Sequence, residues 1–437
     1  MLHRRDAITL AGGAAMAGLT GGPAAQAQTV TTSAATPASL PRAGRAEEVG
    51  LSTERLTRIG GWLREEVAAN RIPGAVVVVA RKGRIAHEEA VGFRDRESGA
   101  AMPVNAVFRI ASMTKPFASL ALMMLVEEGK VMLWHPVSRY LPEFGDQAVG
   151  MERTAVQRPP TVQDLMRHTS GLTSAAGEGV TGADPVQRAY AEANVANRNQ
   201  TSAQFITGLA RMPLMYQPGT HWEYGHSTDV VGRIVEVVSG MDLDAFIKAR
   251  ISGPLGLRDT GFWAPAEAGD RAAKAQVDPV TNRRQAIPDA LQKPNWFSGG
   301  GGMVSTAQDY ARFCQMLLNG GTLDGTRIVS PKTIELMTSN HLPPGTEYSP
   351  GLFARFGGLA PSPTVGYGFG LGFAVRLEQG RSPVPGSIGD YSWGGAYGTY
   401  FWVDPKEELF AVLMLQGPSD RLQYRYGIRQ LVYQAFA

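Results

Sequence analysis

Ser112 and Lys115 are the residues of this sequence whose types and spacing most directly suggest chemistry. They stand three residues apart in the segment FRIASMTKPF, and residues at that spacing share one face of a helix. Because proline is tolerated only in the first turn of a helix, Pro116 predicts that a helix begins close to Ser112. A desolvated lysine amine can serve as a base for a neighbouring hydroxyl, and the N–H groups of a helix start favour a developing anion. The pair therefore predicts a serine nucleophile activated by lysine.

The same spacing also fits a serine that caps a helix beside a solvated lysine. On the motif alone this structural alternative is favoured, because the spacing arises by chance about once or twice in a chain of this length. Two observations favour chemistry. Lys115 is the one lysine of the chain with a serine three residues before it. The Gly-x-Ser-x-Gly motif of α/β-hydrolases is absent from the sequence.

Four more segments follow the Ser112 segment in a fixed order: TVQDLMRHTSGL at 161–172, PGT at 218–220 with WEY at 222–224, GGGGMVST at 299–306, and WGG at 393–395. Together the five segments resemble the serine β-lactamase and penicillin-recognising superfamily, and most of all class C β-lactamases and family VIII carboxylesterases. The resemblance runs from about Val49 to the C-terminus. It implies an α+β, β-lactamase-like fold, in which an antiparallel sheet is flanked by helices and carries an inserted helical domain. It also implies a serine hydrolase that needs no cofactor.

Tyr224 stands where the resemblance implies a third catalytic side chain. A lysine ammonium beside a tyrosine makes the phenolate accessible, so that it can take the serine proton and later protonate the leaving group. A core tyrosine bonded to a carbonyl is the structural alternative. His226 occupies the place of a family asparagine, and three roles stay open for it: orienting Lys115, touching substrate, or structure alone.

The last segment places Trp393 where β-lactamases usually carry a lysine that binds the substrate carboxylate. Trp393 offers an aromatic face and one N–H in place of a full charge. Gly394 and Gly395 allow the strand to approach a ligand closely. By resemblance, the backbone N–H groups of Ser112 and Ala396 form the oxyanion hole. The alternative for Trp393 is an aromatic residue of an edge strand beside a turn.

The elements that must position these residues are predicted from periodicity. At the two ends of the chain we expect helices at 52–67 and 421–436, a β-hairpin at 75–80 and 85–93, and strands at 370–377, 400–403 and 409–415. In the middle we expect helices at 112–128, 162–166, 203–210, 227–238 and 242–250, and a long surface excursion at 264–294. Two sheet-forming ends around a helical middle indicate a discontinuous α/β domain, 46–110 with 295–437, and an inserted helical domain, 111–294.

The first 27 residues are predicted to be an export signal of the twin-arginine type. Arg4 and Arg5 precede a weak apolar run that is too short to span a bilayer, and Ala25-Gln26-Ala27 fits a cleavage site. Two chance arginines in a disordered start are the alternative. Residues 28–45 are rich in Thr, Ser, Ala and Pro and are expected to form a linker. We expect a periplasmic or secreted protein without stable membrane insertion, because no later stretch reaches 18 uncharged apolar residues.

Composition excludes several classes of protein. Lys and Arg total 42 against 39 Asp and Glu, a net charge of +3, which argues against a nucleic-acid-binding protein. A single cysteine, Cys314, excludes a disulfide, a cysteine zinc site or an iron–sulfur cluster within the chain. His221 and His226 lack an Asp or Cys to complete a ligand set, so no metal is expected.

The expected function is therefore an exported serine hydrolase, with a carboxylesterase acting on small or medium acyl groups favoured. A β-lactamase, a D-amino-acid peptidase and an acyltransferase that uses an alcohol are the enzymatic alternatives. An envelope binding protein that kept the fold without turnover is the non-enzymatic one. Related scaffolds support all of these, so the fold alone does not decide among them.

Overall fold

The computed structural model describes residues 39–175, 184–418 and 420–437. The predicted export segment, 1–27, and the first part of the predicted linker lie outside the described residues. From residue 39 onward the chain contacts the folded part: Leu40 is buried, and Arg42 forms a β-bridge with Ile85. The predicted domain boundaries stay a prediction.

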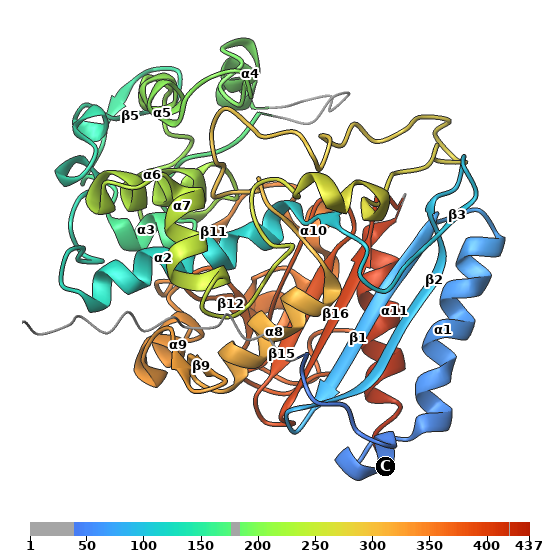
Figure 1. Ribbon diagram of the computed structural model, residues 1–437. Helices are drawn as coiled ribbons and strands as arrows, with labels where there is room; N and C mark the ends of the chain where they lie inside the picture. Colours follow the sequence, from blue (N-terminus) through green and yellow to red (C-terminus); the bar gives the residue numbers. More distant parts are fainter. Residues whose placement is uncertain (1–38, 176–183, 419) are drawn as a thin grey trace, which may run out of the picture. The chain divides into compact units, whose positions relative to one another are not determined.

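An eight-stranded sheet with antiparallel pairing throughout occupies the centre, in the order β12-β13-β14-β15-β16-β1-β2-β3 (Figure 1). Its strands are β1 (Gly74–Arg81), β2 (Arg84–Asp95), β3 (Ala100–Ala101), β12 (Tyr367–Phe369), β13 (Ala374–Arg376), β14 (Tyr391–Gly394), β15 (Tyr400–Asp404) and β16 (Leu409–Leu415). β1 pairs with β16, with Val78 opposite Val412. Strands from the two ends of the chain therefore lie side by side in one sheet, as the sequence predicts.

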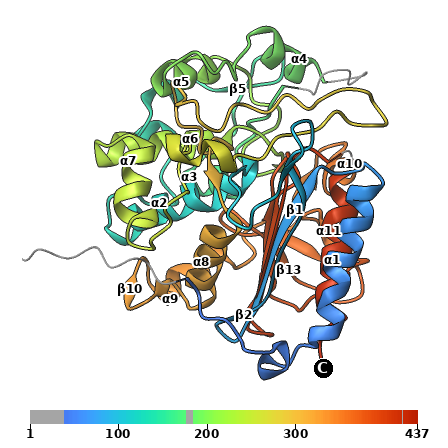
Figure 2. The same cartoon turned by 45° about the vertical axis from the view of Figure 1, so that its right-hand side comes forward.

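Helices cover both faces of this sheet (Figure 2). α1 (Thr53–Ala68) and α11 (Arg421–Tyr433) cover one face, and α8 (Ala307–Leu318) covers the other. This double cover explains why β1 and β16 read as continuous apolar runs, since a strand buried on both faces has no polar side. The predicted α+β class, an antiparallel sheet flanked by helices, is confirmed.

The remaining helices and strands come mainly from the middle of the chain. The helices are α2 (Lys115–Glu127), α3 (Val162–Met166), α4 (Pro185–Glu192), α5 (Ser202–Ala210), α6 (Ser227–Ser239), α7 (Leu243–Ile247), α9 (Pro331–Met337) and α10 (Leu352–Phe356). The short strands are β4 (Phe108–Arg109), β5 (Ala148–Val149), β6 (Thr154–Ala155), β7 (His221–Trp222), β8 (Val304–Ser305), β9 (Thr322–Leu323), β10 (Thr326–Arg327) and β11 (Glu347–Tyr348). α2 packs against α6, which places the Ser112 segment beside the segment that carries Tyr224.

Ser52 caps α1 as predicted, because its side chain accepts a hydrogen bond from the Arg55 N–H.

Three predicted elements differ from the structure. The expected strand 370–377 is wrong in its first half: the chain turns after Phe369, with Gly372 at φ +106°, and re-enters the sheet only at Ala374. The predicted helix 242–250 is α-helical only to Ile247 and then widens into a π-helix, and α11 ends at Tyr433, before Phe436.

The predicted surface excursion, 264–294, carries one 3₁₀ helix, Ala266–Arg271. Several of its small side chains are nevertheless buried, including Ala264, Ala268 and Ala290. Its last residues form one wall of the cavity at the candidate active site.

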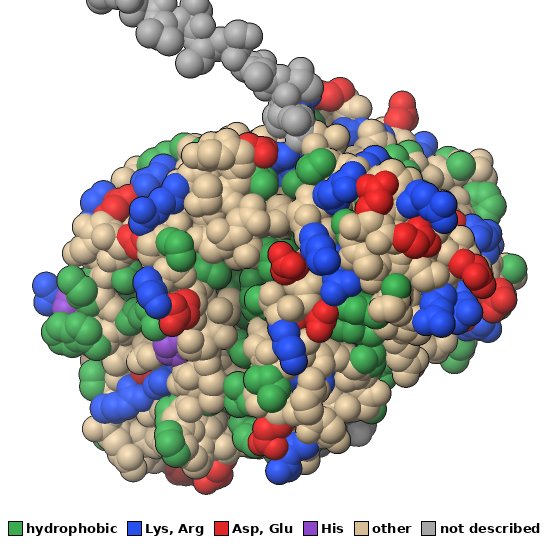
Figure 3. Space-filling model, turned by 90° about the horizontal axis from the view of Figure 1, so that it is seen from below, with side chains coloured by type: hydrophobic (Ala, Val, Ile, Leu, Met, Phe, Trp, Pro, Cys, Tyr) green, Lys and Arg blue, Asp and Glu red, His purple; other side chains and the backbone are tan. Residues whose placement is uncertain are grey.

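The surface seen in Figure 3 carries Lys and Arg side chains interspersed with Asp and Glu, without a broad field of one sign. This arrangement is what the near balance of charges in the sequence predicts. Within the described part of the chain, no helix combines the length and the hydropathy that a membrane crossing requires.

Candidate active site

Ser112 lies in a short 3₁₀ turn, Ala111–Thr114, directly before α2. The sequence predicts an α-helix through Ser112; the structure delays it to Lys115, so the serine stands ahead of the helix. The turn is anchored by β4, which pairs with β8, and by Ile110, whose N–H donates to Met303 O. Ala111 has φ +45°, a conformation that costs a non-glycine residue roughly 1–2 kcal/mol. Such strain is typical of functional turns that the surrounding structure holds in place.

Lys115 is the first residue of α2 and is buried. Its Nζ lies 3.2 Å from Ser112 Oγ and donates to Gly300 O at 2.6 Å. The structure therefore brings the predicted serine–lysine pair into hydrogen-bonding contact. It also shows a partner that the sequence does not indicate, since a backbone carbonyl can come from any residue type.

Tyr224 follows β7 and faces the same lysine. Lys115 Nζ lies 4.5 Å from the centre of the Tyr224 ring, within the range of a cation–π interaction. The Tyr224 hydroxyl accepts a hydrogen bond from Trp393 Nε1 at 3.3 Å. The predicted trio of Ser112, Lys115 and Tyr224 thus forms one cluster, and the role of each residue in catalysis stays a prediction.

Trp393 lies on β14, a strand paired on both sides, so the edge-strand alternative is wrong. Its ring is almost fully buried and contacts the rings of Trp222, Phe356 and Phe369 as well as Tyr224. Because its single N–H is already bonded to the tyrosine, the indole acts on the site through Tyr224 and through its apolar face.

The glycines after Trp393 allow β14 to approach the nucleophile turn. A Cβ atom at Gly395 would collide with Ile110 O and with Thr399 Oγ1, which itself donates to Ile110 O. A Cβ at Gly394 would point the other way, into the guanidinium of Arg425 on α11. Ala396 follows directly, which places it beside the turn that carries Ser112. The predicted oxyanion hole formed by the N–H groups of Ser112 and Ala396 stays a prediction.

His226 and Asp229 form a hydrogen-bonded pair at the start of α6, with Nδ1 to Oδ2 at 2.9 Å. The other carboxylate oxygen of Asp229 accepts from Ser298 Oγ at 2.5 Å and from the Gly300 N–H at 2.9 Å. Burial by itself would raise the pKa of Asp229, but the hydrogen bonds from His226 and Ser298 and the nearby charge of Lys115 hold that pKa below its usual value. Sequence reasoning missed Asp229 and Ser298 as site residues. Asp229 begins the segment Asp229-Val230-Val231-Gly232, which fits the Asp-Val-x-Gly pattern of family VIII carboxylesterases and was a signal for this residue. No sequence pattern points to Ser298.

A cavity of about 470 Å³ opens beside this cluster. Lys115, Tyr224 and His226 line its inner end, and Trp296 lies in its wall. Residues 288–289 and 292–296, mostly from the end of the predicted excursion, form one side. The cavity therefore reaches Lys115 and Tyr224, while Ser112, Trp393 and Ala396 are not among its lining residues. Its volume could hold a small or medium acyl group.

Arg109 holds that side of the cavity in place. Its buried guanidinium donates to the backbone carbonyls of Phe262, Gly302, Pro288 and Asp289. Burial lowers the pKa of Arg109 to about 10, and the charge of Arg198 acts in the same direction. The arginine therefore joins the nucleophile segment to the cavity wall.

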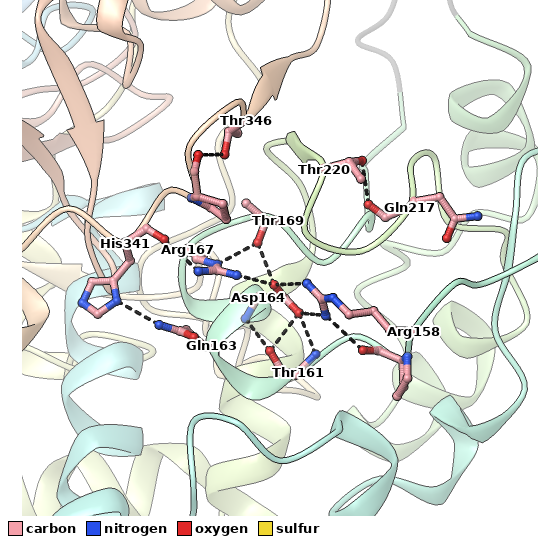
Figure 4. Close-up of polar contacts among 12 residues, drawn as sticks. Arg158, Thr161, Gln163, Asp164, Arg167, Thr169, Gln217, Thr220, His341 and Thr346 are labelled. Carbon is pink, nitrogen blue, oxygen red and sulfur yellow. Dashed lines mark hydrogen bonds and ion pairs between the residues drawn. The ribbon is translucent and has the colours of Figure 1, made fainter.

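The segment 161–172 is held by a network of polar contacts centred on Asp164 (Figure 4). Asp164 pairs with Arg158 and Arg167 and accepts from Thr161 and Thr169. Burial opposes ionisation, but these hydrogen bonds lower the pKa of Asp164 to about 2. Arg167 and Gln163 also bond to His341, whose N–H donates to Phe369 O in β12, so His341 links the α3 segment to the sheet (Figure 4).

His168 is buried, and its ring lies 4.8 Å from that of Tyr224. Burial and the charge of Lys115 hold the pKa of His168 well below its usual value. A neutral imidazole therefore packs against the tyrosine.

Neither a metal ligand set nor a reactive thiol is found among the described residues. No group of three or more His, Cys, Asp and Glu side chains lies close enough together to hold a metal ion within 39–175, 184–418 and 420–437. Cys314 is buried on α8, and burial raises the pKa of its thiol well above the usual value.

Comparison with known proteins adds an independent line of evidence. A family model described as Beta-lactamase matches residues 60–434. Esterase EstB of Burkholderia gladioli is 30% identical over 375 residues, covering 82% of this chain and 89% of EstB. Protein Rv1367c of Mycobacterium tuberculosis is 37% identical over 371 residues, with the same coverages. Among solved structures, EstCE1, titled a hydrolase with promiscuous acyltransferase activity, is 28% identical with a TM-score of 0.72, covering 87% of this chain and 99% of EstCE1.

Proposed function

The chain belongs to the beta-lactamase family and is a serine hydrolase of that fold, and we propose that it is a carboxylesterase whose acyl-enzyme forms on Ser112. One observation carries the proposal. Lys115 Nζ bridges Ser112 Oγ and Gly300 O, with its ammonium facing the ring of Tyr224. This is the arrangement that activates a hydroxyl as a nucleophile and keeps a second proton-transfer group beside it.

In the proposed reaction, Ser112 Oγ attacks the ester carbonyl while its proton passes to the Lys115–Tyr224 pair. The N–H groups of Ser112 and Ala396 stabilise the oxyanion of the tetrahedral intermediate. When the intermediate collapses, the bond to the alkoxy group breaks and the same pair returns the proton to the leaving alcohol. Water then cleaves the acyl-enzyme and regenerates the serine.

An ester is favoured over a β-lactam because β14, Tyr391–Gly394, carries no lysine or arginine and has Trp393 at this position. Trp393 presents an apolar face, and its N–H is bonded to Tyr224. Arg425 lies behind the strand: it is 5% exposed, packs against Gly394 and donates to Gly395 O. Burial lowers its pKa to about 10. A substrate carboxylate beside β14 would therefore find no cation on that strand, although Arg198 and Lys293 line the cavity. Charge-assisted hydrogen bonds are roughly twice as strong as neutral ones, so this difference favours an uncharged ester.

Ser112→Ala tests the nucleophile. We expect a folded protein without ester turnover and without labelling by a fluorophosphonate probe. Loss of the hydrogen bond from Lys115 should cost about 0.5–1.5 kcal/mol of stability. Turnover of p-nitrophenyl esters, nitrocefin and a D-Ala-D-Ala peptide by the wild type would rank the substrate classes. Substantial ester hydrolysis by purified Ser112→Ala protein would refute the serine mechanism, and preferred hydrolysis of nitrocefin or the peptide would refute the esterase assignment.

We also propose that the enzyme acts outside the cytoplasm, in the periplasm or as a secreted protein. The support is in the sequence: the Arg4-Arg5 pair, the weak apolar run and the Ala25-Gln26-Ala27 site.

A further inference from the structure

His226 and Asp229 make a second proton-transfer candidate in the cavity, in addition to Lys115 and Tyr224. Both are held by the start of α6: His226 immediately precedes the helix and Asp229 lies in its first turn. The hydrogen bond between Nδ1 and Asp229 Oδ2 fixes the ring and, with the proton on Nδ1, leaves Nε2 as the basic nitrogen.

Asp229 is a rigid partner for this histidine. Its second oxygen is bonded to Ser298 Oγ and to the Gly300 N–H, so the carboxylate cannot turn away without losing both contacts. The carboxylate also lies in a buried position. A buried carboxylate that holds Nδ1–H is the arrangement that orients a catalytic imidazole and stabilises its protonated form.

Two aromatic side chains pack against the ring of His226 but leave part of it exposed. Tyr190 stacks parallel to it at 6.4 Å between ring centres, and Phe205 contacts it edge-on at 5.4 Å. Its side chain is 13% exposed and lines the cavity together with Lys115 and Tyr224. Within residues 39–175, 184–418 and 420–437, no hydrogen bond to Nε2 is found. Nε2 is therefore available to a molecule in the cavity.

The structure also separates His226 from the orienting role that the sequence left open for it. Lys115 is oriented by Gly300 O, and the N–H of the same residue donates to Asp229. The carboxylate thus has two tasks, one through Gly300 and one through the imidazole. The imidazole is left to act on what enters the cavity.

We propose that His226 is the general base for the acceptor molecule in deacylation, a step that follows from the proposed acyl-enzyme on Ser112. Nε2 takes a proton from water as the water oxygen forms a bond to the acyl carbon. The tetrahedral intermediate then collapses, the bond from the acyl carbon to Ser112 Oγ breaks, and Oγ takes a proton from the Lys115–Tyr224 pair. The imidazolium afterwards returns its proton to solvent in the cavity, so the enzyme ends the cycle unchanged.

Several charged and titratable groups face this histidine and will shape its pH dependence. Asp229 binds it directly and Tyr190 covers one face of the ring. Lys115 and Tyr224 lie along the inner cavity, and the outer wall carries Arg198, Asp289 and Lys293. A pH profile must therefore be compared between variants that leave all of these groups in place.

The test is a pre-steady-state experiment on the full chain with p-nitrophenyl acetate. In His226→Gln we expect deacylation to slow by about 10²–10⁴-fold, the range of general acid–base catalysis, while acylation changes only a few-fold. The p-nitrophenol burst should become pronounced, and intact-mass measurement should show the acetylated enzyme accumulating. The acid limb of the deacylation profile should disappear. His226→Asn replaces this variant if the glutamine protein does not fold.

His221→Gln is the matched control. His221 lies five residues earlier and also pairs with a carboxylate, Glu347 at 3.0 Å, but it does not line the cavity. Deacylation in this variant should stay near the wild-type rate. Equal slowing of acylation and deacylation in His226→Gln, or no slowing, would overturn the inference while leaving the acyl-enzyme intact. Absence of Ser112 labelling by a fluorophosphonate probe in the wild type would instead refute the proposed function on which the inference rests.

Discussion

At the scale of single residues, Trp393 is the side chain that most alters what this cleft can recognise. It removes a cation from the substrate side and gives its N–H to the Tyr224 hydroxyl. The tyrosine is thereby oriented from the β14 side, while His168 packs against its ring. At the position where β-lactamases usually carry a substrate-binding lysine, this chain has a tryptophan that contacts the predicted proton-transfer residue.

Trp393→Phe separates these two contributions. Phenylalanine keeps an aromatic wall but loses the bond to Tyr224, which is worth about 0.5–1.5 kcal/mol, so ester kcat should fall roughly two- to tenfold. Trp393→Lys should instead weaken turnover of neutral esters more than turnover of an anionic penicillin. Steady-state kinetics on paired neutral and anionic substrates will measure both effects. Unchanged kcat in Trp393→Phe would show that the N–H does not position the tyrosine.

Sequence reasoning identified the site residues that can be recognised by their side-chain type and spacing. It missed the residues that contribute only because the fold brings them to the site. Ser112 and Lys115 were predictable because three residues of spacing place them together on one helix start. Gly300 was not, because a backbone carbonyl leaves no trace in residue type. Asp229 differs again: its pattern was visible, but only the fold shows that it bonds both His226 and the Gly300 peptide.

At the scale of elements, the contact between β14 and the nucleophile turn depends on a missing side chain. Gly395→Ala would push a Cβ into Ile110 O and Thr399 Oγ1, with no room for either to retreat cheaply. Overpacking of this kind costs typically 1–3 kcal/mol and should displace Ala396 relative to Ser112. We expect a lower unfolding midpoint and a loss of ester kcat larger than the change in KM.

Gly61→Ala is the control for this prediction. Gly61 lies in α1, and nothing stands within 4 Å of an added Cβ. Alanine there should leave activity unchanged and raise helix stability by up to about 1 kcal/mol. If Gly395→Ala behaves like Gly61→Ala in both thermal melts and kinetics, the close approach of β14 does not matter to catalysis.

The boundaries of a strand were predictable where both faces of the strand are buried, because the sequence is then apolar along its whole length. β16 is found at the residues expected, since Leu409–Leu415 is apolar throughout. The region 370–377 failed because glycines in an apolar run fit both a strand and a turn, and packing decides between them. α4 was missed because only Val186 and Tyr190 of its eight residues are buried.

At the scale of the whole molecule, Asp164 makes stability depend on acid. Its pKa is about 2 in the folded chain against an ordinary value of 3.8. A carboxyl group whose pKa is lower in the folded state than in the unfolded state stabilises the folded state at pH values above its ordinary pKa. This stabilisation, about 2 kcal/mol, is lost as the pH falls from about 4 to 2. Urea unfolding at several pH values should show the loss in the wild type.

Asp164→Asn should remove this part of the acid sensitivity. The substitution leaves Arg158 and Arg167 without their carboxylate, so we expect a free energy of unfolding about 3–5 kcal/mol lower at pH 7. The difference in the free energy of unfolding between this variant and the wild type should narrow by about 2 kcal/mol as the pH is lowered toward 2. Glu335→Gln, at an exposed pair with Lys332, should change little at either pH. A gap that stays constant with pH would contradict the depressed pKa.

Export is a prediction about the whole molecule as well. Replacing Arg4 and Arg5 by lysine should retain the precursor inside the cell, because twin-arginine signals depend on the guanidinium pair. Cell fractionation and the N-terminal sequence of the secreted form will measure this, with cleavage expected after Ala27. Unchanged secretion of the double-lysine variant would contradict a twin-arginine signal.

The pairing of β1 with β16 has a consequence for the folding of the chain during its synthesis. During synthesis β1 leaves the ribosome with β2 beside it on one side, and the strand for its other side is translated far later. At about 5–20 residues per second the apolar edge of β1 waits on the order of tens of seconds for its partner. The nascent chain is accordingly most exposed to aggregation just before β16 emerges.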